Sequence, residues 1–266
     1  MKTGIQGFTL IELIMVIVIV GVLATLSTNI ITIPTKSYLD LSRRTTLVDV
    51  VEMALRRMQR DIRRALPNSI RITGGGTVVE MLHTVDGGRY RKSGSGNILN
   101  FTTSDIGFDV IGVLQNFSEV NTSADQLVIY NLGSGVGQAD AYQASNNNRS
   151  TLTASSSAST LTFTGKQFPI QSPQQRFFIV DTPISYRCDT VNKELLRYDG
   201  YPIAATQPNP PSVTGKLQAN YVAGCAFSYA AGSASRSGLV TLELILTDDA
   251  GESARLIHQI HVDNSP

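Results

Sequence analysis

The first apolar segment of the chain runs from Phe8 to Ala24, and its only charged residue is Glu12. This run is slightly shorter than the roughly 20 residues that a membrane-spanning helix needs. Apolar character returns at Ile30–Ile33, so we expect residues 8–33 to form one transmembrane and assembly helix. Pro34 has no backbone N–H and its ring crowds the preceding turn, so we expect a kink or local break there.

The segment from Thr35 to Leu66 is amphipathic. Its apolar residues recur at steps of three and four, which is the spacing of one helix face. This stripe consists of Leu47, Val51, Ala54, Leu55, Met58, Ile62, Ala65 and Leu66. Pro67 ends the helix, because the residue before a proline is pushed toward extended backbone. We therefore expect residues 34–67 to form the amphipathic half of one long helix, packed on a sheet.

The opposite face of this helix is rich in arginine. Such a face can bind acidic lipid, nucleic acid or a neighbouring subunit. The favoured interpretation is a solvated face whose arginines pair with acidic residues on the same helix. Among the alternatives, a subunit contact ranks first.

After Pro67 the pattern changes to short β-type runs that are separated by turn residues. The runs favoured as strands are Ser69–Ile72, Val78–His83, Ile98–Thr102, Gln126–Tyr130, Thr160–Thr164, Arg176–Val180, Ile184–Cys188, Glu194–Tyr198 and Val222–Tyr229. Leu239–Thr247 and Ala254–Val262 flank a six-residue turn and predict a hairpin. The predicted fold class is α+β, a long N-terminal helix packed on a head, residues 68–266, of antiparallel β-sheets.

A short polar leader with one charge, Lys2, precedes the sequence Gly7-Phe8-Thr9-Leu10-Ile11-Glu12 and the apolar run. A secretory signal has its small-residue cleavage site after the apolar run, whereas here the glycine comes before it. An ionised carboxylate in hydrocarbon costs roughly 2.5–3.5 kcal/mol on insertion scales, so Glu12 needs a partner or a purpose.

This order of residues resembles the class III signal of type IV pilins and pseudopilins. The resemblance implies that residues 1–7 are a cytoplasmic leader, that a prepilin peptidase cuts after Gly7, and that the same enzyme methylates the amino group of Phe8. It also implies that Glu12 guides assembly. Glu12 of one subunit would pair with the amine of a neighbouring Phe8 inside a helix bundle, where breaking such a pair strands a buried charge.

The resemblance also implies a location and partners. The chain would cross the inner membrane once before assembly, with a cytoplasmic leader and a periplasmic head, and would then join a pilus or pseudopilus. Its partners would be the prepilin peptidase/methylase, the major pilin, other minor pilins and the inner membrane.

Four further stretches are similar to minor pilins of the PilW and GspJ group: Met58–Ser69, Gly224–Tyr229, Gly238–Leu242 and His258–Pro266. The whole combination is similar to those of the mannose-sensitive haemagglutinin (MSHA) pilus. This implies a low-abundance subunit that primes or caps a type IV pilus. One departure is that the proline found near the twenty-second mature position of many pilins is Asn29 here, and Pro34 comes later. The alternatives are a type II secretion pseudopilin of the GspJ type and a tip adhesin.

Composition adds little that is specific. There are 22 Lys and Arg against 21 Asp and Glu, a net charge of +1, so we expect no nucleic-acid partner. The Gly133–Gly137 segment has phosphate-loop spacing but opens no amphipathic helix. No serine, cysteine or histidine stands in a pattern that suggests a nucleophile with its base. We therefore expect neither an enzyme nor a cofactor.

Cys188 and Cys225 are candidates for a disulfide, because a head exported across a membrane lies in an oxidising space. The alternative is two free buried thiols. Asp248, Asp249 and Glu252 cluster in the last turn and form a weak candidate for calcium, which prefers oxygen ligands.

Overall fold

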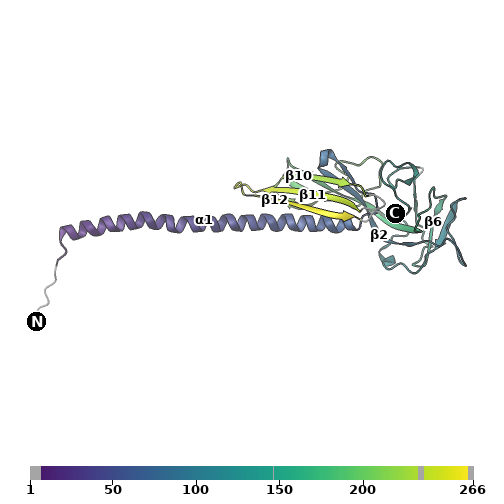
Figure 1. Ribbon diagram of the computed structural model, residues 1–266, viewed down its shortest axis with the longest axis horizontal. Coiled ribbons are helices and arrows are strands. Elements are labelled where there is room, and N and C mark those ends of the chain that lie inside the picture. The colour runs from purple at the N-terminus through teal and green to yellow at the C-terminus, as the bar shows by residue number, and fades with distance from the viewer. Residues whose placement is uncertain (1–6, 146, 233–236, 263–266) are drawn as a thin grey trace, which may run out of the picture.

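The computed structural model describes residues 7–145, 147–232 and 237–262, with only the backbone at residue 26 and residues 28–34. Most of the expected leader and the last four residues of His258–Pro266 lie outside the described residues. A single long helix projects from a β-rich head (Figure 1). This confirms the expected α+β class, an N-terminal helix followed by antiparallel sheets.

The elements follow one another in a simple order. They are α1 (Leu10–Arg63), β1 (Arg71–Thr73), the 3-10 turn η1 (Gly74–Gly76), β2 (Val78–Arg89), β3 (Asp105–Asp109), η2 (Phe117–Glu119), β4 (Gln126–Ile129), η3 (Gly137–Ala139), β5 (Arg149–Thr151), β6 (Thr160–Lys166), β7 (Arg176–Asp189), β8 (Glu194–Tyr198), β9 (Lys216–Asn220), β10 (Val222–Ala230), β11 (Gly238–Thr247) and β12 (Ser253–Val262).

Helix α1 continues through Pro34 without interruption, so the expected local break is wrong. The missing N–H of a proline removes one backbone hydrogen bond, and the helical turns on both sides are long enough to hold the axis. The helix then ends at Arg63, before the expected end at Pro67. The reason is sheet pairing, since the N–H of Leu66 donates to the carbonyl of Leu82 at 2.8 Å and the N–H of Thr84 donates to that of Arg64 at 2.9 Å.

The larger sheet has seven strands and is organised around β7. Strand β7 pairs with β2 along one side, while its other side pairs with β4 up to Val180 and with β8 from Ser185 onward. Strands β1, β5 and β9 extend the sheet at its edges. The two predicted strands Arg176–Val180 and Ile184–Cys188 are therefore one strand.

A second sheet contains β10, β11 and β12, and a third contains β3 and β6. The predicted hairpin is confirmed, with Thr247 of β11 opposite Ser253 of β12. The predicted strand Ile98–Thr102 is wrong, since this segment consists of bends and coil. The side chain of Asn100 accepts the N–H of Thr102 at 2.8 Å, and such local side-chain bonds compete with strand pairing.

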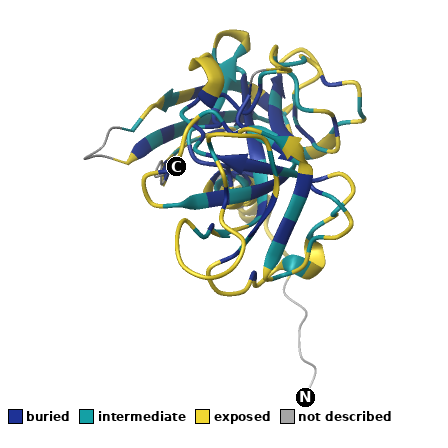
Figure 2. Cartoon of the chain, turned by 90° about the vertical axis from the view of Figure 1, so that its right-hand side faces the viewer, coloured by how far each residue is buried: buried dark blue, intermediate teal, exposed yellow. Residues whose placement is uncertain are grey.

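The main core lies between the amphipathic half of α1 and the two larger sheets. All eight residues of the predicted stripe are buried, and Val51, Met58 and Ile62 are fully so. Seven of the eight belong to one cluster with residues such as Val79 and Val240, and Leu66 belongs to a smaller cluster with Leu82 and Val128. A second core, rich in aromatic residues, fills the far end of the head. An end-on view shows buried positions along the strands and exposed positions along the loops (Figure 2).

A polar contact fixes the helix to the larger sheet near the end of the stripe. The carboxylate of Asp61 accepts a hydrogen bond from the hydroxyl of Tyr186 at 2.7 Å and from Nε of Arg197 at 2.8 Å. Arg197 also pairs with Asp199. Burial, with Asp61 alongside, raises the pKa of Tyr186 well above its usual value, so the phenol stays protonated and donates.

Replacing Asp61 with alanine tests this contact. The change leaves Tyr186 without its acceptor and removes one partner of the buried Arg197. We expect the free energy of unfolding to fall by about 2–3 kcal/mol, below the range for a fully buried pair because Asp61 is partly exposed. Urea unfolding of the full chain measures the change.

The matched control is Asp40→Ala. Asp40 lies on the same helix and pairs with Arg43 at 3.7 Å, but both side chains are about half exposed, so we expect a change below about 0.5 kcal/mol. Equal effects of the two substitutions would contradict a specific role for Asp61.

Candidate assembly site at the N-terminus of the long helix

The predicted processing site lies just outside the first turn of α1. Gly7 and Phe8 are exposed and precede the helix, whose N-cap is Thr9. A Cβ atom at position 7 would meet no atom within 4 Å beyond its chain neighbours. The fold of this chain therefore does not require glycine at position 7, and a requirement for it would come from the enzyme that cuts there.

Thr9 and Glu12 begin the helix together. The hydroxyl oxygen of Thr9 accepts a hydrogen bond from the N–H of Glu12 at 3.4 Å. Threonine at the N-cap with glutamate three residues later is the capping-box pattern, and a carboxylate in the first turn complements the positive end of the helix dipole. Thr9 was not singled out from the sequence, although its spacing from Glu12 carries this signal.

Glu12 makes no side-chain hydrogen bond or ion pair with any residue that the structure describes. Around it, the side chains from Phe8 to Leu23 are exposed on every side of the helix. The large apolar ones among them are at least 46% exposed. An apolar surface of this extent marks a site of contact with lipid or protein. The arrangement is thus an uncovered apolar helix with a single unpartnered carboxylate.

This first half of α1 extends away from the head (Figure 1). In the described part of the chain, no helix is both long enough and apolar enough to cross a membrane.

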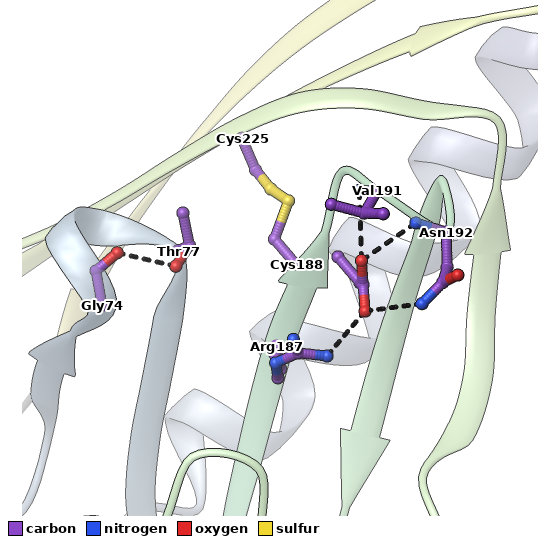
Figure 3. The surroundings of a disulfide bond; sticks show 8 residues. Gly74, Thr77, Arg187, Cys188, Val191, Asn192 and Cys225 are labelled. Carbon is purple, nitrogen blue, oxygen red and sulfur yellow. Dashed lines mark hydrogen bonds and ion pairs between the residues drawn. A yellow bond between two sulfur atoms is a disulfide. The ribbon is translucent and has the colours of Figure 1, made fainter.

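The other candidate residues lie in the head, far along the chain from this site. The structure joins Cys188 of β7 and Cys225 of β10 by a disulfide with Cα atoms 6.5 Å apart (Figure 3). The bond connects the seven-stranded sheet to the three-stranded sheet. Beside it, the carboxylate of Asp189 accepts hydrogen bonds from the side chain of Arg187 and from the backbone N–H groups of Val191 and Asn192. These hydrogen bonds, above all the one from the N–H of Asn192, lower the pKa of Asp189 to about 2.

The acidic residues of the last turn interact with other groups of the protein. The carboxylate of Asp248 accepts the N–H groups of Ala250 and Glu252, both at 2.9 Å, and so shapes the turn. Asp249 pairs with Lys193. Within the described ranges, no three His, Cys, Asp or Glu side chains are placed to hold a metal. Asp248 thus serves the backbone of the turn, and the calcium candidate stays a prediction.

Comparison with known proteins adds one match. Residues 2–28 match the prokaryotic N-terminal methylation motif. No curated protein and no solved structure matches the chain. The motif supports a pilin-type protein, type IV pilin-like or pseudopilin, that is processed by a prepilin peptidase. The motif includes Gly7, Phe8 and Glu12.

The role of Gly7 is tested by Gly7→Val. We expect at least a tenfold loss of processed chain, because a branched side chain at the cleavage site obstructs a peptidase pocket that accepts glycine, while the open space around position 7 leaves the fold unchanged. Mass spectrometry of the N-terminus, from cells with and without the prepilin peptidase, measures the fraction that begins at N-methylated Phe8.

Gly21→Ala is the matched control, since position 21 is equally open, and its processing should equal that of the unmodified chain. Normal cleavage of the Gly7→Val chain would show that Gly7 does not define the processing site.

The disulfide gives a separate prediction for the head. The two cysteines are 37 residues apart, and a loop of that length is expected to contribute about 3–4 kcal/mol on the chain-entropy model. The double variant Cys188→Ser/Cys225→Ser should lose about that much free energy of unfolding in urea, and the reduced unmodified chain should lose a similar amount. A double variant as stable as the oxidised chain would contradict the prediction.

Proposed function

We propose that this chain is a minor pilin that helps to prime or cap a type IV pilus of the MSHA type. The assignment to the MSHA type is based on the sequence similarity to minor pilins such as MshO. The observation that carries the proposal is the apolar start of α1, whose side chains from Leu10 to Leu23 are uncovered on all sides and include one unpartnered carboxylate, Glu12, one turn from the processing site. In this role the chain is a structural subunit and not an enzyme.

Two environments cover the apolar half in turn. Before assembly, residues 8–33 anchor the chain in the inner membrane, with the leader in the cytoplasm and the head in the periplasm. After assembly, neighbouring α1-type helices of the major pilin and other minor pilins replace the lipid. The disulfide of Cys188 and Cys225 suits an oxidising compartment on the far side of the membrane.

Glu12 sets the register of assembly. Cleavage after Gly7 creates a positively charged amino group on Phe8, about one helical turn from Glu12 of the same chain. In a bundle of staggered helices, Glu12 of an incoming subunit meets the amine of a subunit already in place. In a low-dielectric bundle an unpaired carboxylate is costly, so the subunit stops at the stagger that forms the pair.

A type II secretion pseudopilin of the GspJ type would have the same N-terminal machinery. The two proposals differ in outcome, because deletion of a minor pilin removes surface pili, whereas deletion of a pseudopilin removes secretion of exported proteins. Retained piliation with lost adhesion would instead favour the tip adhesin.

The register role is tested by Glu12→Gln, which keeps the size of the side chain and removes its charge. We expect at least a tenfold drop in recovery of the chain with sheared pili, with unchanged processing and an unchanged amount in the membrane. Quantitative immunoblotting of the pilus and membrane fractions measures both.

Glu52→Gln is the matched control. Glu52 lies on the same helix, is partly exposed and pairs with Arg56, so its loss should leave assembly unchanged. Wild-type recovery of the Glu12→Gln chain would exclude the charge pair as the determinant of register.

A further inference from the structure

A polar pocket of about 300 Å³ lies between β5, β6 and the loop that precedes β5. Strand β6 stands at the end of the head that is remote from the N-terminus of α1 (Figure 1). The pocket is therefore well separated from the assembly site. Its lining includes Arg149 and Lys166 together with hydroxyl and amide side chains.

Both cations of the pocket are held by neutral acceptors. The guanidinium of Arg149 donates to Oε1 of Gln126 and to the carbonyl of Gln143, both at 3.3 Å. The ammonium of Lys166 donates to Oδ1 of Asn147 at 3.0 Å. Among the described lining residues there is no aspartate or glutamate. Two positive charges thus share one pocket without an acid between them.

Arg149 also has an unused donor. Its Nε is buried and has no hydrogen-bond partner among the described residues. Buried polar atoms normally have a partner in the protein or in bound solvent or ligand, because an unsatisfied donor costs about 1–3 kcal/mol. The negative charge of Asp140 raises the pKa of Arg149, but the Asp140 carboxylate is hydrogen-bonded elsewhere, since it accepts the N–H groups of Gly135 and Tyr142.

The positive charges of Arg149 and Lys166 also repel each other. Burial lowers the pKa of Lys166, and the positive charge of Arg149 lowers it further. Burial lowers the pKa of Arg149 as well. A like-charge pair of this kind is unfavourable, and an anion between the two groups would relieve it.

We propose that this pocket binds the oxyanion group of a small ligand: a sulfate, phosphate or carboxylate. Arginine supplies a planar array of donors and lysine a point charge, the combination that matches such groups. Ser145, Thr151 and Thr164 line the same pocket, and each carries a hydroxyl group that can donate a hydrogen bond. The volume is at the lower end of the range for small-molecule sites, so it accommodates the anionic group and one attached small ring.

The site is independent of the pilin role, because it uses none of the residues that are processed or assembled. Its position at the remote end of the head makes it available for contact with soluble or surface-borne anions.

The test uses the full chain in detergent and isothermal titration with sodium sulfate, at an ionic strength held constant with sodium chloride. We expect saturable binding by the unmodified chain and at least tenfold weaker binding by Lys166→Gln. The control is Lys92→Gln, an exposed lysine outside the pocket, which should bind like the unmodified chain. Absence of saturable binding of sulfate, phosphate and acetate, or equal affinity in Lys166→Gln, would overturn the proposal.

A second measurement separates a ligand site from a structural cluster. The Lys166→Gln substitution removes one of two positive charges that repel each other. Without added anion, the thermal midpoint of the variant should therefore equal or exceed that of the unmodified chain. Sulfate should raise the midpoint less in the variant than in the unmodified chain. Sulfate stabilises proteins in general, so the difference between the two chains is the informative quantity. A lower midpoint of the variant without anion, together with an equal sulfate effect, would assign Lys166 to structure alone.

The source of the anion is distinguished with a sulfated monosaccharide as a second probe. Affinity at least tenfold above that for inorganic sulfate would indicate an anionic carbohydrate, and equal affinity would indicate the free ion; either result depends on binding that is lost in Lys166→Gln.

Discussion

The burial of one stripe of α1 between two sheets is the interaction on which the head depends. The larger sheet and the three-stranded sheet both contribute to the core that covers Val51, Met58 and Ile62. Without the helix, the inner faces of both sheets would lose the element on which they both pack. The disulfide of Cys188 and Cys225 would not replace it, because it connects the two sheets only at one point. The same helix leaves its side chains from Leu10 to Leu23 without any cover from the head, so one element contains both core residues and an exposed apolar segment.

Much of this division can be predicted from the sequence. The spacing of apolar residues from Leu47 to Leu66 predicts the buried stripe, and all of its members are buried. The hairpin of β11 and β12 follows from alternating apolar residues around a turn rich in Asp and Gly. At the N-terminus, the order of Gly7, Phe8 and Glu12 predicts the processing motif, and the match over residues 2–28 supports it.

The details that depend on distant pairing could not be predicted in this way. Pro183 divides β7 in the sequence, since proline is unfavourable inside a sheet. In the structure it lies where one side of β7 has no partner, between the end of pairing with β4 at Val180 and the start of pairing with β8 at Ser185. Similarly, Asp61 cannot be distinguished in the sequence from the other charged residues on the polar face of the helix. Only the fold brings Tyr186 and Arg197 into contact with it. The pocket of Arg149 and Lys166 lies between two strands, β5 and β6, and neither strand carries a sequence motif that would predict it.

The direction in which α1 leaves the head has a mechanical consequence. The helix is 54 residues long, about 80 Å at 1.5 Å per residue, and its second half lies alongside β11 and β12 (Figure 1). A force that pulls on the first half along the helix axis therefore acts parallel to the contact between helix and strands. Such a force loads the side chains of the stripe together, in shear, instead of peeling them apart one after another. A head held in this way resists detachment from α1 when the helix is pulled along its own axis.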